Sequence, residues 1–186
     1  MLYLMSKDIL VAKFENNAMQ VENDALLPLY FKTHDNLDVW LGKRAIDSRR
    51  TNSRLLKKAL RLMKRDDVST ALKFNAAKIT DTYWVKDSHS DLTYDDVKFK
   101  TNNYDTLALC RDLNAFNQTP SRTPELTNTG SFEKCWRLIN KEWWIYKSGS
   151  NNAYFSELFI YEFCKKMGFP TAKYEMDDGY IRTKDF

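Results

Sequence analysis

Trp143-Trp144-Ile145-Tyr146-Lys147 is an aromatic run that ends on a lysine, and it lies in the segment from Thr127 to Phe186 that decides the fold. Aromatic and β-branched content of this kind is typical of a β-strand. A turn at Asn140-Lys141 separates the run from an earlier one, Trp136–Ile139. We therefore expect two neighbouring strands, the second of which carries Lys147 at its end.

A helix and a hairpin are predicted after this lysine. The polar residues 148–152 lead into an apolar segment, Tyr154–Met167, which stops at Gly168, and glycine commonly ends a helix. Two short alternating runs then surround the turn Asp177-Asp178-Gly179. The predicted order is strand, strand ending in lysine, helix carrying glutamate, and hairpin.

Two charged residues of this segment have apolar neighbours. Side chains alternate along a strand, so Lys147 shares a face with Trp143 and Ile145. The neighbours of Glu157 at helical spacing are mostly apolar or aromatic: Ala153, Tyr154, Ile160, Tyr161 and Cys164. An unpaired buried carboxylate costs roughly several kcal/mol. We therefore predict that Glu157 points from an apolar stripe and forms an ion pair with Lys147, the nearest cation one loop upstream.

A lysine at the end of a strand, paired with a glutamate on the next helix, positions nucleotide phosphates in the small lobe of protein kinases. The alternative is an amphipathic helix on a hairpin, in which any local donor satisfies Glu157. Spacing alone favours this second, plainer structure.

Several segments resemble the bacterial HipA-like serine/threonine kinases, which are toxin-type kinases of toxin–antitoxin systems and their relatives. The kinase-specific matches are Gly130–Trp136, Trp144–Lys147, Ser156–Leu158 and Lys166–Pro170. A divergent branch with an extended amino-terminal part also contains segments similar to Asn52–Leu56, Asp81–Val85 and Thr123–Thr127. The resemblance covers most of the chain, and its kinase-specific part covers about the last third.

This resemblance implies a role for four residues. Lys147 would contact the phosphates of ATP, Glu157 would hold this lysine, and Gly130 and Ser131 would lie over the phosphates. The loop has one glycine where the common kinase loop has three, and Ser131 is a candidate autophosphorylation site by the same resemblance. The strand Tyr180–Phe186 would lead to the adenine hinge.

No catalytic residue is predicted in this chain. The aspartate that accepts the substrate proton, and the side chains that hold Mg²⁺, would belong to a large lobe supplied in cis or in trans, so that the chain looks like the front half of a kinase. ATP with Mg²⁺ is the cofactor implied once that lobe is present. We expect no phosphoryl transfer from these residues alone, and at most weak nucleotide affinity.

The expected fold is α+β, with a mixed helix and strand subdomain at 1–120 and a kinase-like small lobe at 121–186, an antiparallel sheet with one packed helix. In the first part we predict a hairpin of Leu2–Met5 with Ile9–Phe14 and a strand at Met19–Val21. Helices are predicted at 36–46, at 51–65 and at 69–75. A strand is predicted at 80–85, a capping box at Thr93, and a linker at 114–128.

The predicted helix at 51–65 is strongly basic on one side, and Arg54, Lys58 and Arg61 are its candidate contacts to nucleic acid. An antitoxin or DNA-binding partner is implied by the resemblance. The plainer interpretation, which we favour, is a solvated face whose long side chains cover their own core stripe. The second function class is accordingly a non-catalytic DNA- or protein-interaction module that retains a small-lobe shape.

Net charge, apolar runs and cysteine spacing argue against a membrane-spanning, a secreted disulfide-linked or a zinc-binding protein. The net charge is +4, and no apolar run approaches the ~20 residues that span a bilayer. The first eight residues lack the basic region and apolar core typical of a signal peptide, so we expect none there, and the three scattered cysteines form neither a disulfide framework nor a zinc motif. His34 and His89 have no metal ligand at suitable spacing. We expect a cytoplasmic protein with no membrane partner and no metal site of its own.

Overall fold

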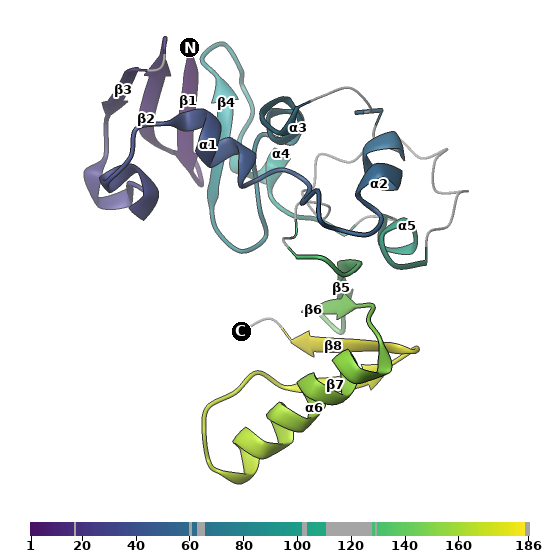
Figure 1. Cartoon of the computed structure of the whole chain (residues 1–186). Helices are drawn as coiled ribbons and strands as arrows, with labels where there is room; N and C mark the ends of the chain where they lie inside the picture. Colours follow the sequence, from purple (N-terminus) through teal and green to yellow (C-terminus); the bar gives the residue numbers. More distant parts are fainter. Residues whose placement is uncertain are drawn as a thin grey trace.

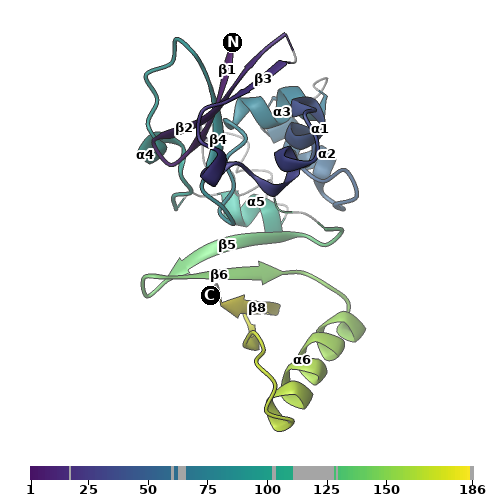
Figure 2. The ribbon, with the colours of Figure 1, turned by 90° about the vertical axis from the view of Figure 1, so that its left-hand side faces the viewer.

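The computed structural model describes residues 1–16, 18–59, 61–62, 66–101, 104–110, 128 and 130–184. Within these ranges the chain is a mixed α+β protein with two antiparallel four-stranded sheets and six α-helices. The predicted α+β class is confirmed. In both views the first sheet and α6 lie at opposite ends of the molecule, with the second sheet between them (Figures 1 and 2).

The first sheet has the order β3-β2-β1-β4. Its strands are β1 (Leu2–Ser6), β2 (Ile9–Glu15), β3 (Ala18–Val21) and β4 (Tyr83–Asp87). The predicted hairpin is confirmed, because β1 and β2 pair from Leu2 with Phe14 to Ser6 with Ile9. The predicted strand at Met19–Val21 is also present, as β3, and the strand predicted at 80–85 begins and ends later, as β4.

Short helices cover one side of this sheet. They are η1 (Asp24–Leu26), η2 (Leu29–Lys32), α1 (Leu37–Gly42) and α3 (Asp67–Lys73), and they pack with Leu4, Val11, Phe14 and Val85 of the sheet. Asn36 caps α1, since its side chain accepts a hydrogen bond from the Val39 amide. The helix itself is shorter than the predicted 36–46, and α3 begins and ends earlier than the predicted 69–75.

The remaining helices of the first part are α2 (Ser53–Ala59), α4 (Tyr94–Val97) and α5 (Tyr104–Cys110). The capping box predicted at Thr93 is present, with Asp96 as its partner. Helix α2 is shorter than the predicted 51–65, because Arg61 already has a positive φ of 58°; residues 60 and 63–65 lie outside the described residues. The predicted linker at 114–128 does so too, except for residue 128.

The second sheet has the order β5-β6-β8-β7. Its strands are β5 (Lys134–Ile139), β6 (Glu142–Lys147), β7 (Tyr174–Asp177) and β8 (Tyr180–Lys184), and α6 (Asn151–Lys166) connects β6 to β7. The predicted order of elements is therefore confirmed. Asn140 and Lys141 both have positive φ, as a two-residue hairpin turn of the common type requires.

The two faces of the second sheet have different surroundings. Cys135, Trp144 and Tyr146 share a core with Leu56 of α2 and Leu107 of α5, and α5 lies against β5 in both views (Figures 1 and 2). Lys147 lies on the opposite face, since side chains alternate along β6. The core thus includes residues from both predicted subdomains, while the predicted boundary at 120–121 lies outside the described residues and stays a prediction.

Helix α6 differs from the expected packed helix, because none of its residues is buried. Phe155, Phe159 and Phe163 form an exposed ladder of stacked rings along it, with centroids 5.7 and 6.3 Å apart. Ile160, which was expected in the apolar stripe around Glu157, is 55% exposed. In the described ranges, the helices are too short or too polar to traverse a lipid bilayer.

Candidate functional site

The predicted ion pair between Lys147 and Glu157 is present. Lys147 ends β6 and Glu157 lies in the second turn of α6, and the Lys147 Nζ is 3.1 Å from Oε2 and 3.4 Å from Oε1 of the carboxylate. The intervening turn is fixed by Ser150, whose hydroxyl accepts a hydrogen bond from the Ala153 amide and caps the helix. Glu157, in the second turn of α6, is therefore placed beside the end of β6.

The pair is less buried than the prediction of a carboxylate in an apolar stripe assumed. The side chains of Lys147 and Glu157 are 20% and 36% exposed, so the pair is half-buried rather than enclosed. The Nζ of Lys147 also lies 5.1 Å from the centre of the Tyr174 ring on β7, which favours a cation. An open hollow of about 280 Å³ adjoins the carboxylate, between α6 and β7.

A second lysine lies next to the pair. Lys134 of β5 is the cross-strand partner of Lys147. Burial lowers the pKa of the Lys134 ammonium, and the charges of Lys147 and Arg50 lower it further, whereas Asp47 and Glu157 act in the opposite direction. Like charges directly opposite each other in a sheet are unfavourable, so this arrangement gathers positive charge at a cost that a bound anion would offset.

Gly130 brings the predicted phosphate loop to this lysine. Its φ is +112°, a conformation that favours glycine. A Cβ at this position would lie 2.5 Å from the Lys134 Nζ, so the ammonium group sits directly against the loop backbone. Lys134 therefore links two predicted site residues, since its ammonium lies against Gly130 and its strand position is opposite Lys147.

Residues 130–133, which precede β5, are here called the Gly130 loop, and residues 47–51 are called the 47–51 loop. The 47–51 loop holds the Gly130 loop in place. The Gly130 amide donates to Oδ2 of Asp47 at 2.8 Å, and the Thr51 amide donates to the Ser131 carbonyl at 3.1 Å. The guanidinium of Arg50, which is buried, donates to the Lys134 carbonyl. The exposed Ser131 side chain is thus carried by a tethered backbone.

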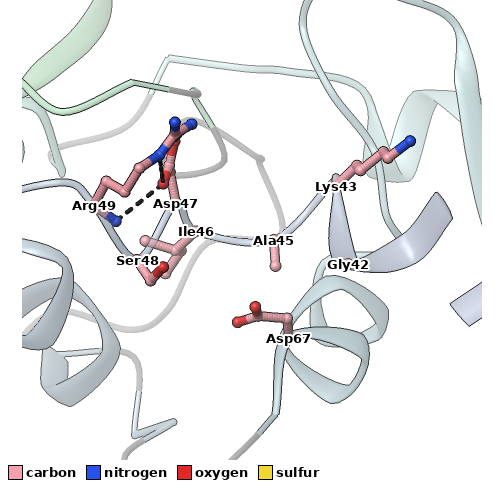
Figure 3. A pocket seen from close by; sticks show the side chains of 8 residues that line it. All are labelled: Gly42, Lys43, Ala45, Ile46, Asp47, Ser48, Arg49 and Asp67. Carbon is pink, nitrogen blue, oxygen red and sulfur yellow. Dashed lines mark hydrogen bonds and ion pairs between the residues drawn. The ribbon is translucent and has the colours of Figure 1, made fainter. Parts of the chain in front are cut away.

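Arg49 is the counterion of Asp47. Figure 3 shows its side chain folded back over the Asp47 carboxylate, with an Nη2–Oδ2 distance of 3.0 Å. The hydrogen bonds from Arg49 and from the Gly130 amide hold the pKa of Asp47 well below its usual range. The residues in Figure 3 line a hollow of about 230 Å³ between this loop and Asp67 of α3.

The other predicted residues lie elsewhere. Arg54, Lys58 and Arg61 are exposed on α2 or just after it, and α2 and α6 are well separated in both views (Figures 1 and 2). The structure does not bring these cations to the Lys147–Glu157 pair. His34 is exposed and is stacked on Tyr30 with ring centres 4.7 Å apart.

Sequence reasoning missed Lys134, Asp47 and Arg50 as parts of the site. Lys134 could have been found, because the two-residue turn Asn140-Lys141 fixes a register that pairs residue 134 with residue 147. Asp47 and Arg50 carry no comparable pattern, since they reach the loop across more than 80 residues of chain.

The arrangement can bind an anion. Two lysines point from one face of a sheet beside a glycine-containing loop, and a carboxylate from α6 fixes the position of one of them. Comparisons of the chain with protein-family models, with curated proteins and with solved structures found no match. The function must therefore be argued from the geometry and from the resemblance of the segments.

Proposed function

We propose that this chain supplies the ATP-phosphate-binding lobe of a HipA-like serine/threonine protein kinase of the toxin–antitoxin type. The observation that supports this most directly is the ion pair between Lys147, at the end of a central strand, and Glu157, on the helix that follows. In protein kinases a lysine and a glutamate so placed position the nucleotide phosphates.

Each residue of the site then has a role. Lys147 would neutralise the phosphates and Glu157 would fix its ammonium group, while Gly130 and Ser131 would lie over them. Lys134 would add a second positive charge, because its ammonium lies against Gly130 and its strand position is opposite Lys147. Phosphate binding commonly relies on lysine ammonium groups together with backbone amides of such loops.

Phosphoryl transfer would need a large lobe, in cis or as a partner chain. That lobe would supply the catalytic aspartate and the ligands of Mg²⁺, and ATP would bind between the two lobes. An antitoxin or DNA-binding protein is a further partner under this proposal, and a kinase of this type would act in the cytoplasm. Without the large lobe we expect weak ATP binding and no transfer.

The test is a titration of the purified chain with ATP, with and without Mg²⁺. Lys147→Met is expected to weaken binding about tenfold or more, since it removes a charged contact to phosphate. Lys165→Met, which alters an exposed lysine about two turns further along α6, is the control and should change the affinity less than twofold. Equal affinities for wild type and Lys147→Met would exclude this site as the phosphate contact.

A second candidate is an interaction module that binds DNA through the exposed cations of α2. The supporting observation is that Arg54, Lys58 and Arg61 are all exposed. A generic duplex at low salt is the probe, because phosphate contacts are strongly salt-dependent. If charge reversal at these three positions leaves duplex binding unchanged, this second candidate fails.

A further inference from the structure

The Gly130 amide has an anionic acceptor from a distant part of the chain. It donates to Oδ2 of Asp47 at 2.8 Å, across 83 residues of sequence. The Asp47 side chain is only 9% exposed, and the Thr51 amide holds the next residue of the loop, Ser131. This contact is therefore part of an ordered junction between the 47–51 loop and the Gly130 loop.

The groups around the Asp47 carboxylate are those that would receive a phosphate. Backbone amides of a glycine-containing loop are common donors to phosphate oxygens. The negative charge of Asp47 also acts on the Lys134 ammonium, where it opposes the lowering of the pKa that burial and the neighbouring cations cause. Under the proposed function, the Gly130 amide and the Lys134 ammonium both bind the nucleotide phosphates. In the structure, the Asp47 carboxylate accepts the hydrogen bond of this amide, and its charge acts on this ammonium.

We propose that Asp47 is an internal competitor for the nucleotide phosphate at the Gly130 amide. A phosphate oxygen accepts this N–H only after the carboxylate has left it, so that the 47–51 loop regulates the affinity of the site. This inference rests on the proposed function and adds its regulation. The first part of the chain, which carries Asp47, is thereby coupled to nucleotide binding.

Arg49 makes the displacement feasible. It is 77% exposed and bonds the Asp47 carboxylate through both its side chain and its backbone amide (Figure 3). The carboxylate can therefore move away from Gly130 together with its counterion, without leaving an unpaired buried charge.

The direction in which Asp47→Asn changes the affinity for phosphate distinguishes a competing carboxylate from one that only supports the loop. Asp47→Asn keeps a hydrogen-bond acceptor of the same size but removes the negative charge. If Asp47 competes, the variant binds phosphate more tightly, by about tenfold, the effect of removing one like charge at about 5 Å in a partly exposed site. If Asp47 only supports the loop, binding is unchanged or weaker.

The experiment is a calorimetric titration of wild type and Asp47→Asn with inorganic tripolyphosphate and with ATP. Asp67→Asn is the matched control: Asp67 lines the same hollow and loses the same charge, but it bonds Lys57 instead of the Gly130 loop. Its affinity should stay within twofold of wild type. Tighter binding by Asp47→Asn alone supports the competitor.

Two contrary outcomes are distinguishable. Equal or weaker binding by Asp47→Asn, with measurable binding by wild type, overturns the competitor and leaves the proposed function standing. Absence of binding by both proteins overturns the proposed function, and the competitor with it. Hydrogen exchange of the Gly130 amide tests the contact without any ligand: Asp47→Ala should speed it about tenfold, and an unchanged rate refutes the contact.

Discussion

The Lys147–Glu157 pair can be tested by its contribution to stability, independently of any ligand. The perturbation is a double-mutant cycle of Lys147→Met, Glu157→Gln and the double variant, each compared with wild type. Glu157→Gln keeps the length of the side chain, Lys147→Met shortens it by one atom, and both substitutions remove the charge. The cycle isolates the interaction between the two residues from their separate contributions to packing.

The structure sets the expected size of this interaction. Exposed ion pairs contribute about 0.2–1 kcal/mol, whereas breaking a buried pair costs about 3–5 kcal/mol. Here the ammonium is 3.1 and 3.4 Å from the two carboxylate oxygens, and the side chains are 20% and 36% exposed. Coulomb's law with the dielectric constant of water gives about 1 kcal/mol at such a separation. We therefore predict a coupling of about 1 kcal/mol.

The assay is urea unfolding of the four proteins, and α6 offers a matched control. Glu162 and Lys165 also form an ion pair on this helix, but at 3.6 Å and with side chains that are 54% and 61% exposed. Their coupling should be about 0.3 kcal/mol. Equal couplings for the two pairs would refute the reasoning, since Lys147 and Glu157 would then gain nothing from their position against the sheet.

Three further predictions concern stability. Arg182 forms ion pairs with two carboxylates and lies over an aromatic ring, so Arg182→Met should lower the free energy of unfolding by about 2 kcal/mol. The control Lys184→Met, at the exposed end of the strand, should lower it by less than about 0.5 kcal/mol. Similar losses for the two variants would contradict a stabilising role for these contacts of Arg182. The pKa of Asp47 is lower in the folded state than its unfolded value near 3.8, so its contribution to the free energy of unfolding is complete above that pH and is lost as the pH falls below it. The stability of Asp47→Asn should therefore depend less on pH below about 4 than that of wild type. Acid-unfolding curves identical to those of wild type would count against the Gly130 contact. Phe159→Ala should change the free energy of unfolding by less than about 1 kcal/mol because the ring is exposed, whereas Leu56→Ala in the core should lower it by about 2–5 kcal/mol. Thermal melts measure both changes. A large loss of stability in Phe159→Ala would show that the ring is covered in solution.

The second sheet could be predicted because its elements follow one another along the chain. Alternation in Trp143–Lys147, turn residues at Asn140-Lys141 and at Asp177–Gly179, and the stop at Gly168 each specify local structure. The pairing of Lys147 with Glu157 followed from the same short separation. The predicted roles of these residues in binding nucleotide remain proposals.

The exposure of α6 could not be predicted from periodicity. The helix has apolar or aromatic residues on two sides, one around Tyr161 and Cys164 and one along the Phe155–Phe163 ladder. A hydrophobic pattern does not say which of two such stripes lies toward the sheet. The contact of Asp47 with Gly130 was unpredictable for another reason: it joins residues 83 apart, and no local rule relates them.

The central claim is that Lys147, held by Glu157, contacts the phosphates of a nucleotide. The most direct measurement is the ³¹P chemical shift of ATP titrated with wild type and with Lys147→Met under the same conditions. If Lys147 contacts the phosphates, wild type shifts the phosphate resonances saturably and the variant requires about tenfold more protein for the same shift. Identical titration curves, or no shift with wild type at millimolar ATP, would contradict it.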